Sequence, residues 1–110
     1  MKVCVQGLWH LGCVTAGCLA AVGHEVVGLD FDEHVIRVLR AGKPPIFEPG
    51  LEEMVGAGLN SGRLQFAASL DELPSDIELL WVAYDTPVNE DDVADVDFVV
   101  AQVEKVLPFL

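Results

Sequence analysis

The chain has 110 residues, which is enough for one modest domain and hardly enough for two. Hydrophobic residues make up 52% of it and charged residues 22%, a balance that predicts a packed core and excludes a disordered chain. Its formal charge of −12 repels phosphate backbones and anionic lipid headgroups, so we expect neither nucleic-acid binding nor a role at a membrane surface.

The predicted elements alternate between apolar, β-rich segments and segments with helical periodicity. They are, in chain order, a strand at 2–6, a helix at 11–22, a strand at 25–30, a helix at 33–41, a helix at 49–60, a strand at 63–68, a short helix between Ser69 and Pro74, a strand at 77–84 and a helix at 96–106.

Two of these segments carry specific expectations. Asp32 is a plausible N-cap for the helix that follows it. The strand at 77–84 is apolar almost throughout, as expected of a strand that is covered on both faces, and Trp81 is therefore expected in the core. If no fifth strand follows, the outer edge of this strand is unpaired, and we expect self-association or reduced stability.

A strand followed by a helix, repeated about four times, is typical of a parallel sheet with helices on both faces. The sequence therefore predicts an α/β fold with a doubly wound, Rossmann-type parallel sheet of about four strands. Residues 1–110 are expected to form one domain, and no internal repeat or linker divides them.

The three cysteines, Cys4, Cys13 and Cys18, lack the CxxC spacing of a zinc site. We expect them to be small core residues in a reducing compartment, which favours a cytoplasmic protein. The three histidines are not spaced as metal ligands, and solvent-exposed side chains are expected for them. The carboxylates between Glu90 and Asp97 lack the ordered spacing of a calcium loop, so no metal site is predicted.

The turn after the first strand, "GLWHLG", has the outline of a dinucleotide-binding fingerprint. Gly7, Trp9 and Gly12 occupy the three glycine sites of G-x-G-x-x-G, and Asp30 closes the second strand 18 residues after Gly12. A carboxylate at that position favours NAD, because it repels the 2′-phosphate of NADP. The alternative is an ordinary turn in an α/β protein.

Several longer segments, all in order from residue 1 to about residue 106, resemble the nucleotide-sugar dehydrogenases, the UDP-glucose/GDP-mannose dehydrogenase family. They are "GLWHLGCVTAGCLA", Asp30, "GKPPIFEPGLEEMV", "GRLQFAASLDEL", "DTPV" and "ADVDFVV". "PIFEPGLEEM" is the most specific of them, because the fold does not demand it.

The resemblance implies that this part of the chain binds NAD and that each matching residue has a cofactor-binding role. These residues are Gly7, Trp9 at the middle glycine site, His10 and Leu11 through their backbone, Gly12, Asp30 and Thr86. Val35 and Asp85 differ from the residues that many members have at these positions.

The resemblance also implies what this chain lacks. The family's catalytic cysteine motif and its substrate domains lie beyond residue 110, so no catalytic residue is assigned. The chain is then the N-terminal part of a longer enzyme that binds a nucleotide sugar through other domains, oxidises its C6 alcohol to a carboxylate, and forms a homo-oligomer at full length. The alternative is a non-catalytic binding or assembly module, in which Trp9 fills the pyrophosphate site.

Overall fold

A computed structural model describes residues 1–45, 48–84 and 96–107, with residues 96–98 described by their backbone alone. Every predicted element is present, and its bounds differ from the predicted ones by no more than two residues. The elements are β1 (Lys2–Gln6), α1 (His10–Val22), β2 (Glu25–Leu29), α2 (Glu33–Arg40), α3 (Leu51–Ser61), β3 (Leu64–Ala67), the 3-10 turn η1 (Leu70–Glu72), β4 (Leu79–Val82) and α4 (Val96–Val106).

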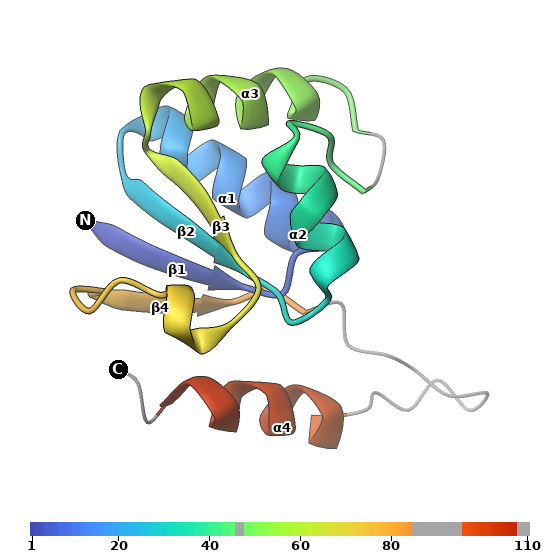
Figure 1. Ribbon diagram of the computed structural model, residues 1–110, viewed down its shortest axis with the longest axis vertical. Helices are drawn as coiled ribbons and strands as arrows, with labels where there is room; N and C mark the ends of the chain where they lie inside the picture. Colours follow the sequence, from blue (N-terminus) through green and yellow to red (C-terminus); the bar gives the residue numbers. More distant parts are fainter. Residues whose placement is uncertain (46–47, 85–95, 108–110) are drawn as a thin grey trace.

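The four strands form one parallel sheet in the order β3-β2-β1-β4. Helices α1, α2 and α3 lie on one side of this sheet and α4 lies on the other (Figure 1). The predicted α/β fold with a doubly wound parallel sheet is therefore confirmed. None of the helices within the described ranges is long and apolar enough to cross a bilayer.

Alternation along the strands divides the core into two layers. In β1, Val3 and Val5 are buried under the helices α1, α2 and α3, whereas Cys4 belongs to the opposite layer. That second layer also contains Val27, Leu29, Ala67 and the fully buried Val106 of α4.

A buried glutamine fixes α4 to the end of β1. The side chain of Gln6 is fully buried, and its Nε2 donates to the backbone oxygen of Gln102 at 2.8 Å and to the Tyr84 hydroxyl at 3.2 Å. The bond to Gln102 positions α4 against the sheet, since a buried amide donor is costly when unpaired. The Oε1 of Gln6 is buried without a hydrogen-bond partner among the described residues.

The prediction that β4 is covered on both faces, with Trp81 in the core, is wrong. Leu79, Trp81 and Val82 are 41%, 44% and 38% exposed. Because β4 is the last strand of the sheet, it has a neighbour on one side only within the described part of the chain. An apolar strand composition therefore did not guarantee burial here.

We predict that the chain self-associates through the exposed β4 edge, because unpaired apolar edges pair with other chains. Sedimentation velocity should show an average mass that rises with protein concentration. Trp81→Lys should weaken the association, since a lysine on an edge strand must be desolvated on pairing. Val22→Lys, which makes the same change at an exposed residue of α1, is the control. A wild-type chain that stays monomeric at high concentration would contradict the prediction.

The expectation that all three cysteines are core residues holds for two of them. Cys4 and Cys13 are buried, but Cys18 is exposed on α1, where its Sγ lies 4.0 Å from Met54 Sδ. Burial raises the pKa of Cys4 and of Cys13 to about 12, and the nearby Asp30 carboxylate contributes at Cys13.

We therefore predict that Cys18 alone reacts with a thiol reagent in the folded chain, and that Cys4 and Cys13 react only on unfolding. The variant Cys18→Ser should show no fast labelling; fast labelling of that variant would contradict the prediction.

The buried thiols should also make the fold sensitive to alkali. Their pKa values lie above the ordinary value of 9.0, so the stability they provide is complete below that pH and is lost as the pH rises toward about 12.

Candidate functional site

The candidate site lies where the chain leaves β1 and turns into α1. β1 lies between β2 and β4, and the chain crosses from β3 on one side of the sheet to β4 on the other. Ligands of open α/β sheets bind outside the carboxyl ends of the strands at such a switch point. The "GLWHLG" turn is at this end of the sheet, beyond Gln6.

The first and third glycine positions are both required by the geometry of the turn. Gly7 has φ +96°, and a Cβ there would come within 2.8 Å of Tyr84 Cδ1. A Cβ on Gly12 would lie 1.6 Å from the carbonyl oxygen of Gly7. The two glycines thus permit the tight turn and the close packing of the helix start on the turn that such a fingerprint requires.

Trp9 occupies the middle position with a negative φ of −113°, outside the left-handed region that favours glycine. The residue is 49% exposed. The turn therefore keeps its shape without the middle glycine, whose other role in such fingerprints is to let a ligand approach the backbone closely.

The N-terminus of α1 is open to a ligand. Trp9 is its N-cap and makes no side-chain capping hydrogen bond, and the first turn carries no acidic residue. By contrast, α2 is capped as predicted by Asp32, whose carboxylate accepts from the N–H groups of His34 and Val35. No side chain in the described ranges caps the N–H groups of this first turn, and with the helix dipole they make the start of α1 suited to a phosphate.

Asp30 holds the turn as well as presenting a carboxylate beside it. It follows the last residue of β2, and its Oδ2 accepts from the N–H of Leu8 at 2.9 Å while Oδ1 accepts from the N–H of Asp32 at 2.9 Å. A carboxylate has about four lone-pair sites, so each oxygen keeps acceptor capacity for a ligand hydroxyl.

One contact of the site was missed by the sequence reasoning. His10, the first residue of α1, is exposed as expected, but its Nε2 lies 2.9 Å from Glu48 Oε2. Glu48 belongs to the "PIFEPG" segment, which the sequence marked as unusual without giving its side chains a role. The sequence therefore singled out the segment that contains Glu48, but not its partner. His10 and Glu48 are 38 positions apart, and only the fold brings them together.

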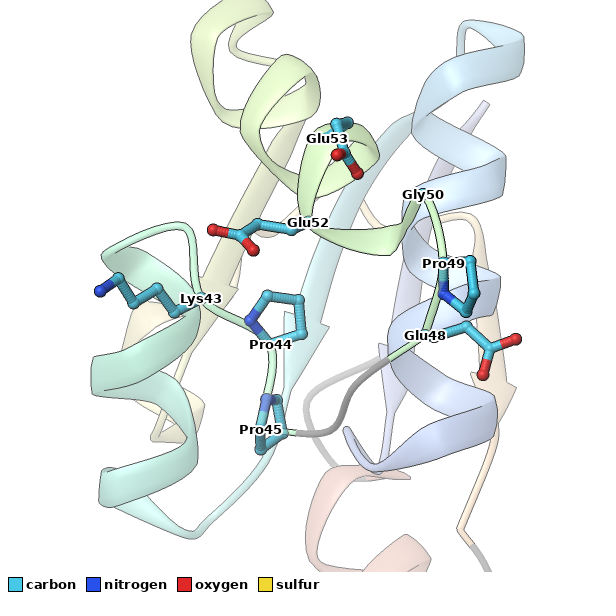
Figure 2. A pocket seen from close by; sticks show the side chains of 8 residues that line it. All are labelled: Lys43, Pro44, Pro45, Glu48, Pro49, Gly50, Glu52 and Glu53. Carbon is cyan, nitrogen blue, oxygen red and sulfur yellow. The ribbon is translucent and has the colours of Figure 1, made fainter.

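Glu48 also lines an open pocket of about 600 Å³ between the end of α2 and the start of α3 (Figure 2). Within the described ranges, none of the predicted site residues is part of its lining. The lining residues are Lys43, Pro44, Pro45, Glu48, Pro49, Gly50, Glu52 and Glu53.

Some predicted features lie outside the described residues. Thr86, the predicted cofactor residue after β4, is one of them, as are Asp85 and all the acidic residues from Glu90 to Asp95. Of Asp97, in α4, only the backbone is described. Across residues 1–45, 48–84 and 96–107, no group of three His, Cys, Asp or Glu side chains could hold a metal ion.

A parallel sheet, a glycine turn after its first strand, an open helix N-terminus and an acid after the second strand together define a Rossmann-type dinucleotide-binding domain. The chain belongs to the UDP-glucose/GDP-mannose dehydrogenase family. Its residues 1–110 match the model of that family's NAD binding domain. The cofactor of this domain is therefore NAD.

The curated relatives and solved structures agree with this assignment. UDP-glucose 6-dehydrogenase of Pseudomonas aeruginosa is 41% identical over 96% of this chain and 23% of its own length. A ternary complex of GDP-mannose dehydrogenase from the same species matches at 32% identity with a TM-score of 0.88, over 96% of this chain and 24% of that one. A UDP-glucose dehydrogenase of Pyrobaculum islandicum matches at 42% identity with a TM-score of 0.86, also over 96% and 24%. The chain thus spans about a quarter of the length of these proteins.

We predict that Asp30→Ala lowers both stability and NAD affinity, because the carboxylate holds two backbone N–H groups of the site. Loss of hydrogen bonds to a charged group should lower the unfolding free energy by about 2 kcal/mol and weaken the binding of NAD roughly tenfold or more. Denaturant unfolding and calorimetric titration measure the two effects. Asp32→Ala makes the same charge change two residues away and should cost only about 1 kcal/mol through loss of the α2 cap. Equal loss of affinity in both variants would contradict a specific role for Asp30.

Proposed function

We propose that this chain is the N-terminal, NAD-binding part of a longer cytoplasmic nucleotide-sugar dehydrogenase, which oxidises the C6 alcohol of a UDP- or GDP-sugar to the uronic acid. The observation that carries the proposal is the match of residues 1–110 to the NAD binding domain of the family. The relatives are about four times as long as this chain, which supports a larger protein.

We assign the cofactor contacts to the turn that follows β1. Gly7 and Gly12 allow α1 to begin close to the strand, and the N–H groups of His10 and Leu11 at its open N-terminus would donate to the pyrophosphate. Thr86, in the segment after β4, is proposed to line the same site, as in the family.

Asp30 is proposed to accept hydrogen bonds from the adenosine ribose hydroxyls. Its oxygens already hold Leu8 and Asp32, which orients the carboxylate before any ligand arrives. Two free lone-pair sites suit the two hydroxyls of NAD, whereas the phosphate of NADP would meet a like charge.

Trp9 is proposed to lie along the cofactor. Its indole is half-exposed at the edge of the turn, so it could cover part of the ligand and bury apolar surface. At the same time a side chain at this position holds the pyrophosphate farther from the backbone. The chain is therefore expected to bind NAD more weakly than a turn with three glycines would.

The rest of the reaction is assigned to parts of the protein outside this chain. Hydride transfer to NAD supplies the oxidising power, while the covalent chemistry on the sugar needs a catalytic cysteine that the resemblance places beyond residue 110. Substrate recognition and the homo-oligomer of the full-length enzyme are assigned to those parts as well.

Calorimetric titration tests the proposal. The wild-type chain should bind NAD measurably and NADP poorly, and Trp9→Gly should bind NAD at least as tightly, with a gain of up to roughly tenfold if one phosphate hydrogen bond is restored. The chain mixed with NAD and UDP- or GDP-sugars should form no NADH. Absence of NAD binding in both wild type and Trp9→Gly would favour a module that keeps the fold without the cofactor, and NADH formation would place the catalytic groups within these residues.

A further inference from the structure

The pair between His10 and Glu48 connects the predicted pyrophosphate turn to the loop before α3. His10 is the first residue of α1, and side chains there lean toward the N-terminal end of the helix, where a phosphate would be bound. Its ring nitrogen Nε2 lies 2.9 Å from Glu48 Oε2. Figure 2 shows Glu48 on the side of the pocket opposite Lys43.

The loop that carries Glu48 is anchored to the rest of the fold. The Glu48 carbonyl accepts from the N–H of Leu51 at 3.0 Å, and Leu51 is only 1% exposed. Gly50, between them, has φ +82° and forms the N-cap of α3. Leu51 lies beside Gly17 of α1, so this turn and α1 are held together independently of the His10 contact.

The chemistry of this contact determines which nitrogen of a neutral His10 carries the proton. An ionised carboxylate is an acceptor only, so Nε2 must be the donor to Glu48. In the neutral ring, Nδ1 then has a lone pair and no hydrogen. A phosphate oxygen is also an acceptor, so this tautomer can donate nothing to it through Nδ1.

Carboxylates outnumber cationic groups among the described side chains around His10 and the neighbouring pocket. In α1, His10 is the only titratable side chain apart from its cysteines. Glu48 faces it from the loop, and Lys43, Glu52 and Glu53 line the same pocket as Glu48. Asp30 adds a carboxylate to the same turn, where it accepts from the N–H of Leu8. This surplus of carboxylates opposes an anionic ligand unless a positive charge is added.

We propose that His10 is a cofactor-binding side chain whose tautomer is set by Glu48, so that binding of the NAD pyrophosphate takes up one proton on Nδ1 of His10. The proton comes from solvent, and the imidazolium then donates through Nε2 to Glu48 and through Nδ1 to a phosphate oxygen. Glu48 is the positioning residue of this pair. This inference rests on the proposed function, since it needs NAD to bind at the start of α1.

Calorimetric titration of the 110-residue chain with NAD, in two buffers of different ionisation enthalpy near neutral pH, measures the protons taken up. Wild type should take up a substantial fraction of one proton. His10→Gln should take up none and bind NAD roughly tenfold more weakly, because a charge-assisted hydrogen bond is lost. His10→Lys should recover part of this affinity without proton uptake, because lysine is already charged.

Glu48→Gln separates the tautomer effect from a structural role. A glutamine can donate to Nε2, which lets a neutral His10 present an N–H at Nδ1. This variant should therefore bind NAD more tightly than wild type, by up to roughly tenfold, with clearly reduced proton uptake. If Glu48 only stabilised the loop, its loss would weaken binding.

His24→Gln is the matched control, because His24 lies at the opposite end of α1, near the N-terminal amine. It should match wild type in both affinity and proton uptake. Wild-type binding without proton uptake, or unchanged uptake in His10→Gln, would overturn the inference and leave the proposed function intact. Absence of NAD binding by wild type and every variant would instead overturn both.

Discussion

The close approach of α1 to the turn after β1 is the constraint on which the rest of this fold depends. A Cβ on Gly12 would lie 1.6 Å from the carbonyl oxygen of Gly7, so only glycine permits α1 to start where it does. From that start the helix crosses β1 and β2 and supports α3 through Gly17 and Leu51. The same approach places the first turn of α1, which no described side chain caps, at the end of the sheet where a phosphate would bind.

The carboxylates of Asp30 and Asp32 explain why the N-termini of α1 and α2 differ. Asp32 satisfies the N–H groups of α2, which closes that terminus to other anions. Asp30 accepts from Leu8 within the turn, and leaves the first turn of α1 uncapped. In a chain with a formal charge of −12, this uncapped helix start without acidic residues offers an anionic cofactor favourable partial charges.

Most of the fold could be predicted because its signals are local. Apolar runs, the spacing of Gly7, Gly12 and Asp30, and the capping residue Asp32 each depend on nearby residues, and all of them agree with the structure. The exposure of Trp81 and Cys18 could not be predicted in the same way. Both residues lie in apolar segments whose composition is typical of buried elements. Whether one face of such a strand or helix is covered depends on which other elements pack against it.

The sequence by itself determined the order and type of the elements, the glycine turn and the acid that closes β2, because backbone sterics and hydrophobic periodicity act over a few residues. The tertiary structure alone decided that Asp30 holds Leu8, that Gln6 holds α4 and that Glu48 meets His10. Each of these contacts joins groups that are 22 to 96 positions apart in the sequence. Only the pairing of the parallel strands and the packing of the helices on the sheet bring these groups within hydrogen-bonding distance.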